Sequence, residues 1–467
     1  MRNTGPIGPV AVSVALLLLF VAPLMRGGNR QVALIALEAI ALAFMLSVLV
    51  RVVFSVPQQF AHRPAISPAS LLIAFLLLSP AWLALVYLLP VPAGFWSTTP
   101  GREIYLGLLP AAGVTPPAFL PLSLVPDATL RSLLAGLPLV AGFLIGYLAR
   151  GAQLKLLFGL VVAIAFAQTV MGLLQMAGGA QSALYFGGDG GRPFGTFANP
   201  NHFANYLAMA LALYVYLAWD NLQSSVHHGH GRAAEFAARH RAGLWISGGL
   251  LLLVGILISR SRGAALTGLP AAMLAVALVL FSSRRVGWRA ALLMLGGGLA
   301  AAVVLVGPEV LVSRFNPSGI TGAASIRGLL TATTLEGARE FWPWGAGWGS
   351  YAAVYPRFEP MGSDGVADYA HHDYAQMLFE GGVFAVAMAA AFLWLAAHRA
   401  VLLIRFAVRH RALDGQRMLC AMCGLGLLGL MLHSLVDFNM HIPANAILGA
   451  LLAGAYLRPL HTKDATA

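Results

Sequence analysis

The sequence predicts an all-α protein that crosses a membrane many times. Of its 467 residues, 59% are hydrophobic and only 10% are charged, whereas soluble domains carry roughly 25% charged residues. The hydrophobic residues gather in blocks of about 17 to 24, each long enough to cross roughly 30 Å of hydrocarbon as a helix. Helices are expected because lipid offers no partners to open backbone groups. A single soluble globular domain is excluded.

The hydrophobic blocks number about twelve and follow one another through one transmembrane domain, residues 1–467. No internal repeat is evident, and no soluble domain is appended. The first block lacks a small-residue cleavage site, so we expect a retained helix and not a signal peptide. The expected spans lie near residues 8–25, 31–50, 68–90, 131–149, 154–176, 203–219, 243–259, 264–281, 290–307, 373–397, 417–437 and 444–458.

The placement of lysine and arginine predicts the orientation of these spans. With the N-terminus in the cytoplasm, 18 of the 29 basic residues fall on the inner side, and most acidic residues fall outside. Both termini are therefore expected in the cytoplasm. The net charge of +12 is explained by this inner excess facing anionic membrane lipids, so no nucleic-acid partner is expected.

Three connections are too long to be simple turns. Residues 91–130 are rich in proline, and residues 220–242 are polar and cytoplasmic in this topology. The largest, residues 308–372, is inserted on the outer side between the ninth and tenth expected helices and contains Trp342, Trp344 and other aromatic residues. Because a solvated linker would not be so rich in tryptophan, we expect a folded, functional outer loop.

The first polar constellation is Ser259-Arg260-Ser261-Arg262-Gly263, at the expected outer boundary between two apolar helices. Arginine near a membrane is costly unless something compensates it, and a bound anion would do so. Gly263 permits close backbone approach and a helix start, so we expect Arg262 to bind an anion. Arg260 either binds the same anion or extends to lipid phosphate.

A second constellation runs from Arg192 to His202 and includes Asn199 and Asn201. Gly195 and the pair Asn199-Pro200 indicate a tight turn into a helix, whose free amides an asparagine can cap. Capping accounts for one asparagine only. For the other polar residues, ligand contact and structural capping both stay open.

A third constellation runs from Asp368 to Gly382. His372, Gln376 and Glu380 recur every four residues, so they share one helix face that points into the bundle. Such a polar stripe, with Asp373 beside it, suggests a catalytic cleft that opens outward. Histidine is suited to move a proton near neutral pH when a carboxylate or carbonyl orients it.

Weaker candidates lie elsewhere in the chain. Arg327, in the large loop, is either a solvated charge or a site residue, and Asp437 is placed to orient a basic residue. Gln168 and Gln175 share one helix face, which is either a substrate groove or an interhelical contact. The histidine-rich residues 227–230 lack helical spacing and nearby carboxylates, so no metal site is expected.

Together these motifs resemble the bacterial O-antigen ligase and O-antigen polymerase superfamily, which are polytopic glycosyltransferases of the cell envelope. The resemblance runs from about residue 190 to residue 450. The matching motifs are Gly195-Thr196-Phe197-Ala198-Asn199-Pro200-Asn201-His202, Ser261-Arg262-Gly263, Arg327 followed by Pro343-Trp344-Gly345-Ala346-Gly347, the stretch from His371 to Gly382, and Asp437-Phe438-Asn439.

The family motif at the tenth helix does not decide between two histidines. It has a histidine, then a small polar residue, with leucine four positions and glycine eleven positions after the histidine. Counting from His371 places Gly382 on the glycine, but His372 and Ala375 stand where a small polar residue and leucine are usual. Alignment favours His371 as the catalytic residue, whereas the helix face favours His372.

The resemblance implies a GT-C-like membrane fold and an inverting glycosyltransferase of the bacterial inner membrane with a periplasmic active site. The implied donor is an undecaprenyl-diphosphate-linked glycan, the acceptor a hydroxyl of lipid A core or of a growing glycan, and no cofactor or metal is required. His371 would be the base, and Arg262 would stabilise the diphosphate leaving group. The implied substrate-binding residues are Arg192, Arg260, Arg327, His372, Asp373, Gln376, Asn199, Asn201, His202 and Asp437.

Two alternatives to a ligase or polymerase stay open. Protein O-oligosaccharyltransferases belong to the same class but often carry additional C-terminal sequence. A transporter or flippase of lipid-linked oligosaccharide would also suit twelve helices. It is less favoured because the polar residues cluster at the outer face, not at the bilayer midplane, and because the two halves show no repeat.

Overall fold

The computed structural model describes residues 7–55, 67–186, 191–226, 232–282, 323–359 and 367–460, with isolated positions between 289 and 300. Within these residues, eight helices are long and apolar enough to cross a membrane, or nine if one bent pair forms a single span. The expected all-α, multi-pass membrane class is confirmed. The expected ninth span, 290–307, lies largely outside the described residues.

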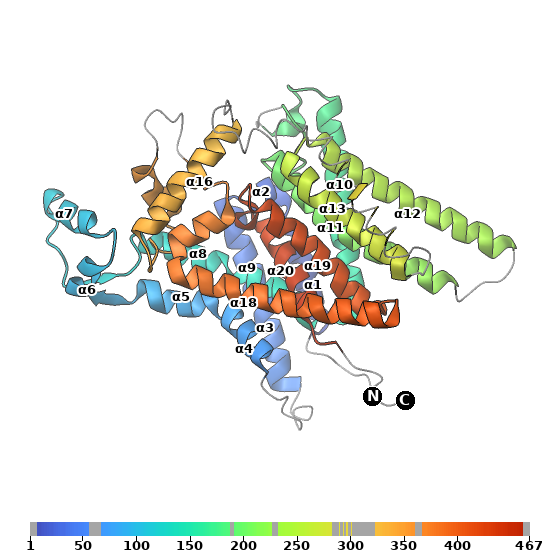
Figure 1. Ribbon diagram of the computed structural model, residues 1–467, viewed down its shortest axis with the longest axis horizontal. Coiled ribbons are helices and arrows are strands. Elements are labelled where there is room, and N and C mark those ends of the chain that lie inside the picture. The colour runs from blue at the N-terminus through green and yellow to red at the C-terminus, as the bar shows by residue number, and fades with distance from the viewer. Residues whose placement is uncertain are drawn as a thin grey trace.

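The described helices follow the expected spans closely (Figure 1). Short strands β1 (Pro90–Pro92) and β2 (Phe119–Pro121) pair antiparallel. The helices are α1 (Pro9–Val21), α2 (Leu24–Gly27), α3 (Gln31–Ser55), α4 (Pro68–Leu77), α5 (Ser79–Leu88), α6 (Ala93–Thr98), α7 (Glu103–Ala111), α8 (Pro126–Ala135), α9 (Leu137–Leu148), α10 (Gly151–Ala177), α11 (Pro200–Val226), α12 (Arg232–Ile258), α13 (Arg262–Ser282), α16 (Ala323–Glu340), α17 (Tyr351–Val354), α18 (Asp373–His410), α19 (Gly415–His433) and α20 (Pro443–Leu457).

Two expected spans are interrupted near prolines. The helices α4 and α5 meet at an angle of 57° within the expected span 68–90, where Pro80 lies in the first turn of α5. Proline lacks an amide hydrogen and cannot continue the hydrogen bonds of the preceding helix. In the same way α8 gives way to α9 at Gly136, with Pro138 in the first turn of α9.

Small residues let the central helices approach closely. The helix α11 packs against α10, α12, α13 and α19, and α20 packs against α9. A Cβ on Gly146 of α9 would lie 2.1 Å from the carbonyl oxygen of Leu451, and one on Gly454 would lie 2.0 Å from that of Phe143. Glycine is therefore required where α9 and α20 cross, as is common in membrane helix packing.

The outer loop is folded against the start of α18. Figure 1 shows α18 along much of the long axis, with α16 beside its first turns. The segment 343–347 crosses α18 where the helix is broken at Gly382, which has φ +51° and ψ −130°. The amide of Val383 donates to the carbonyl of Pro343 at 2.8 Å, and the amide of Ala346 donates to that of Phe379 at 2.9 Å.

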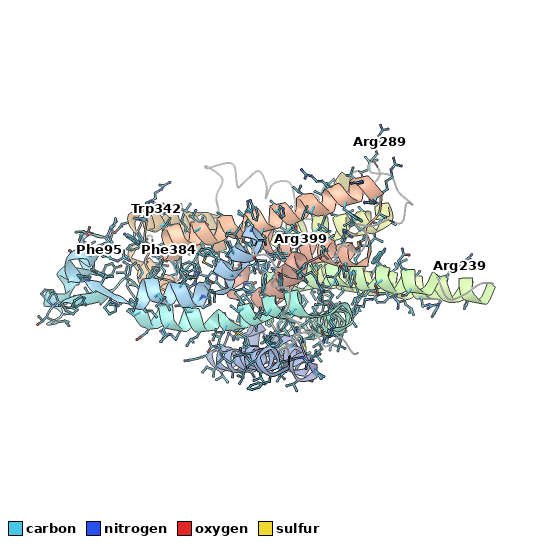
Figure 2. The ribbon with its side chains drawn as sticks, turned by 90° about the horizontal axis from the view of Figure 1, so that it is seen from below. Phe95, Arg239, Arg289, Trp342, Phe384 and Arg399 are labelled. Atoms are coloured by element: carbon cyan, nitrogen blue, oxygen red, sulfur yellow. The ribbon has the colours of Figure 1, made fainter. Side chains whose placement is uncertain are left out.

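The two ends of the molecule differ in their side chains. Figure 2 shows Phe95, Trp342 and Phe384 toward one end of the long axis and Arg239 and Arg289 toward the other. Near the aromatic end, buried Arg102 donates from Nη2 to the carbonyls of Leu122 at 2.7 Å and Gly345 at 2.8 Å. These bonds join the proline-rich segment 91–130 to the outer loop.

Replacing Gly382 with alanine should strongly destabilise the protein. A Cβ there would lie 2.1 Å from the carbonyl oxygen of Pro343, and L-residues rarely adopt its backbone conformation. We expect a loss of about 2 to 4 kcal/mol, measured as a lower thermal midpoint in detergent. Gly328→Ala is the matched control, because nothing lies within 4 Å of that Cβ. An unchanged midpoint in Gly382→Ala would contradict the described crossing.

Candidate functional site

The candidate site is centred on the carboxylate of Asp437, which is fully buried in the turn between α19 and α20. Its Oδ1 lies 3.4 Å from Nδ1 of His371 and 3.6 Å from Nε2 of His202. Its Oδ2 lies 3.6 Å from Nη2 of Arg327 and accepts a 2.6 Å hydrogen bond from Nδ2 of Asn201. One carboxylate thus brings together α11, α16 and the residues before α18.

The surroundings of Asp437 keep it ionised. Burial alone would raise the pKa of its carboxyl. The contacts with His202 and His371, together with the charge of Arg327, outweigh burial and hold the pKa well below its usual value of 3.8. Buried carboxylates are stable only when paired in this way, so the site carries a fixed negative charge beside its histidines.

The local sequence explains how Asn201 and His202 reach Asp437. The side-chain oxygen of Asn199 accepts from the amide of Asn201 at 2.8 Å and so caps the start of α11. The preceding turn is held by α10. Oε1 of Gln175 accepts from the amides of Phe194 and Gly195, and Oε1 of Gln168 accepts from that of Thr196. The two glutamines thus bind this turn.

The two adjacent histidines before α18 have different surroundings. His371 has a φ of +51°, in the left-handed region, and its ring lies edge-on to Phe438 at 4.7 Å. His372 is the N-cap of α18, where its Nδ1 accepts from the amide of Ala375 at 3.2 Å. Burial lowers the pKa of His372. Of the two, His371 therefore contacts the central carboxylate.

The expected polar stripe along α18 binds the outer loop. The Gln376 side chain accepts from the amide of Ala370 at 3.1 Å and donates to Glu380 at 3.3 Å. The Glu380 carboxylate accepts from the amides of Gly349 at 2.9 Å and Tyr351 at 3.1 Å. Gln376 and Glu380 point into the bundle, as the spacing predicted. The sequence also predicted a cleft beside them, but residues of the loop occupy that place.

Asp373 forms a second carboxylate–histidine pair. Its Oδ1 lies 2.6 Å from Nδ1 of His441, and its Oδ2 accepts from the amide of Met440 at 2.9 Å. Burial lowers the pKa of His441. The hydrogen bond to Asp373 and the charge of that residue raise the pKa by more, so the net change is upward. Sequence reasoning missed His441. The sequence feature that could have identified His441 is its position four residues after Asp437, in a turn between two apolar helices.

Three of the predicted arginines are exposed: Arg192, Arg260 and Arg262. In the stretch 259–263 the serines are buried, and the hydroxyl of Ser261 accepts from the amide of Ala264 at the start of α13. Gly263 lies against His433, since a Cβ there would be 2.3 Å from Nε2 of that ring. The start of α13 therefore lies at the same end of the bundle as Asp437. Within the described residues, no contact joins these arginines to Asp437.

Two adjoining hollows open beside the Asp437 cluster. The first, of about 350 Å³, is polar and is lined by Arg26, Asn29, Ala198, Asn199, His202, Ala367, Asp368, Tyr369, His371, Phe438 and Ile442. The second, of about 410 Å³, is largely aromatic and is lined by Met25, Arg26, Tyr185, Phe186, Phe194, Thr196, Phe197 and Ala198. Arg26 and Ala198 belong to both. Sequence reasoning missed Arg26, Asn29 and the aromatic walls.

Comparison with known families identifies the central part of this chain. Residues 247–390 match the family model described as O-antigen ligase. These residues are the part of the chain that is similar to O-antigen ligases and are named the O-antigen ligase region. The resemblance drawn from the motifs is therefore confirmed. A search of curated proteins finds no match to the chain.

The O-antigen ligase region contains some residues of the site and omits others. It includes Arg262, Arg327 and His371, whereas Asn201 and Asp437 lie outside it. Within the described residues, no group of three or more His, Cys, Asp or Glu side chains could hold a metal ion.

Replacing Asp437 with asparagine should destabilise the protein in a pH-dependent way. The pKa of Asp437 is lower in the folded protein than in the unfolded chain. The stabilisation that its ionised carboxylate gives to the folded state is therefore present above about pH 4 and is lost as the pH falls toward the folded pKa. We expect a cost of about 3 kcal/mol at neutral pH, because Arg327 loses its carboxylate partner and the two histidines lose their charged neighbour. Thermal unfolding of both proteins from pH 3.5 to 8 measures it.

The difference in thermal midpoint should be constant between pH 5 and 8 and should shrink below pH 4. Asp368→Asn, at an exposed position, is the control for removing a carboxylate. A difference that grows as the pH falls would contradict the ionised state of Asp437.

Proposed function

We propose that this protein transfers a glycan from undecaprenyl diphosphate to an acceptor hydroxyl, as an O-antigen ligase or a polysaccharide polymerase. The observation that carries the proposal is the contact between His371 and buried Asp437 at the wall of a polar hollow. His371 also lies within the O-antigen ligase region. A histidine oriented by a carboxylate is suited to take a proton from a hydroxyl.

The geometry supports a single displacement at the anomeric carbon. Nδ1 of His371 faces Asp437, which leaves Nε2 to take the proton from the acceptor hydroxyl. The acceptor oxygen bonds to the anomeric carbon while the bond from that carbon to the diphosphate breaks, which inverts the configuration. Asp437 stabilises the imidazolium that forms. The histidine then returns its proton to solvent.

Positive charge is needed where the diphosphate leaves. Arg327 is the predicted arginine that contacts the central carboxylate, and its side chain is 32% exposed. In the proposal Arg262 assists from the start of α13, and Arg192 and Arg260 supply further positive charge for the donor. His202, Asn199, Asn201, His372, Asp373 and Gln376 hold the site in shape and bind substrate.

The proposed location is the bacterial inner membrane, with both termini in the cytoplasm and the site in the periplasm. The basic end labelled by Arg239 and Arg289 supports this orientation, since cytoplasmic segments are rich in lysine and arginine. His371 lies at the start of α18, far along the chain from the basic end of that helix at Arg409. The described parts of the loop, residues 323–359 and 367–372, would then lie on the periplasmic face.

Replacing His371 with alanine should abolish most transfer. Loss of a general base lowers kcat by about 100- to 10,000-fold, so little product should form from purified lipid-linked glycan. Arg262→Ala and Arg327→Ala should also lower the rate. His398→Ala is the control, because that exposed residue lies on α18 far from the site. Wild-type-like transfer by the His371 and Arg262 variants would contradict the enzymatic proposal, and loss of lipid flipping without any transfer would favour a transporter.

A strain that lacks this protein distinguishes a polymerase from a ligase. Loss of a polymerase leaves single glycan units on the lipid carrier, whereas loss of a ligase leaves long chains. The mass of the accumulating lipid-linked products measures this. If the deletion strain instead lacks glycosylated protein, the protein is a protein O-oligosaccharyltransferase.

A further inference from the structure

The turn between α1 and α3 has an unusual backbone. Met25, Arg26, Gly27 and Gly28 follow one another with φ values of +54°, +65°, +69° and +81°. Glycine adopts this left-handed conformation readily, but Met25 and Arg26 do so only when the surrounding structure imposes it. Such imposed strain in non-glycine residues is typical of functional positions.

Long-range contacts hold this turn in place. The hydroxyl of Thr196 donates to the carbonyl of Pro23 at 2.6 Å. A Cβ on Gly27 would lie 2.6 Å from the Phe197 ring, and one on Gly28 would lie 3.0 Å from Pro443. The turn is therefore fixed between the segment that leads into α11, which carries Asn201 and His202, and the start of α20, which follows the turn that carries Asp437.

The fixed turn presents Arg26 to both hollows. Its side chain is exposed and lines the polar hollow of His202 and His371 as well as the aromatic hollow of Tyr185 and Phe194. Within the described residues, its guanidinium has no hydrogen bond and no ion pair. A cation held by a strained turn at the junction of two cavities, without a carboxylate partner, is suited to bind an anion.

We propose that Arg26 binds the diphosphate of the lipid-linked donor, with the first isoprenoid units in the aromatic hollow. This inference rests on the proposed transferase function. The donor is a linear molecule whose diphosphate lies between sugar and isoprenoid. The site has the same order, because Arg26 lies between the polar hollow that holds His371 and the hollow walled by Phe186, Phe194 and Phe197.

The charges around the junction suit a diphosphate. Arg26 lies on the hollow's wall, and Arg327 approaches the same cluster through Asp437. The carboxylate of Asp437 is already in contact with Asn201, Arg327 and His371. Asp368 is the acidic residue that lines the polar hollow, and it is exposed.

Binding of farnesyl diphosphate to the purified full-length protein tests this assignment. Arg26→Ala and Arg26→Gly should weaken the Kd for farnesyl diphosphate at least tenfold and leave binding of farnesol unchanged. Arg26→Gly should not lower the thermal midpoint, because glycine suits the left-handed conformation. Arg26→Lys should retain part of the affinity. Arg30→Ala, which removes an exposed charge outside both linings, should bind like the wild type.

A second variant tests the aromatic hollow. Phe186 is 59% exposed and lines that hollow. Phe186→Ala should weaken farnesyl diphosphate binding severalfold while leaving inorganic diphosphate binding unchanged, whereas Arg26→Ala should weaken both. Equal loss of both ligands in Phe186→Ala would overturn the placement of the isoprenoid.

The outcomes separate this inference from the proposed function. If the wild type transfers glycan and Arg26→Gly does so with an unchanged KM for the donor, the inference fails and the transferase proposal stands. If the wild type neither transfers glycan nor binds farnesyl diphosphate, both fail. A raised donor KM in Arg26→Gly, with a thermal midpoint at or above that of the wild type, supports the inference.

Discussion

The pairing of one buried carboxylate with two histidines, an arginine and an asparagine determines how α11, α16 and the start of α18 are arranged. Asp437 has no exposed surface, and an unpaired charge in such a place would be too costly to keep. Its partners come from α11, from α16 and from the residue before α18. Segments separated by more than 200 residues are thus positioned by the same two oxygen atoms.

The outer loop supports that arrangement from the other side of α18. The segment 343–347 occupies the break at Gly382, and the Glu380 carboxylate binds two amides of the same loop. The start of α18 is therefore fixed by the loop on one face and by Asp437 on the other. His371, between these two anchors, has a left-handed backbone conformation. A histidine held in this way is oriented before any substrate binds.

The class of fold was predictable from the sequence, because long apolar blocks are local features, and the polar clusters named there include His202, His371 and Asp437, which the structure brings together. The sequence could not assign side chains to partners. His372, Gln376 and Glu380 do share a helix face, but spacing does not say whether a cleft or a folded loop covers that face. Arg26 was missed because its position depends on a turn held by residues far along the chain.

The same limit applies to the ends of the spans. Apolar composition predicts where a helix crosses the membrane, and Pro80 marks the break near Leu78, but neither gives the direction of α5, which packs against α8. The exposed residues Arg192, Arg260 and Arg262 show what the sequence could not predict about the site. Charge near a boundary indicates an anion site, but it does not show which way each arginine side chain points.

The central claim is that Asp437 and His371 act as one unit, and a double-mutant cycle on transfer activity tests it most directly. Residues that act together show strongly non-additive losses. We predict that Asp437→Asn lowers kcat in the wild-type background but has almost no further effect in His371→Ala, with protein folding verified for each variant. Losses that simply multiply in the double variant would show that the two residues act independently and would contradict the account.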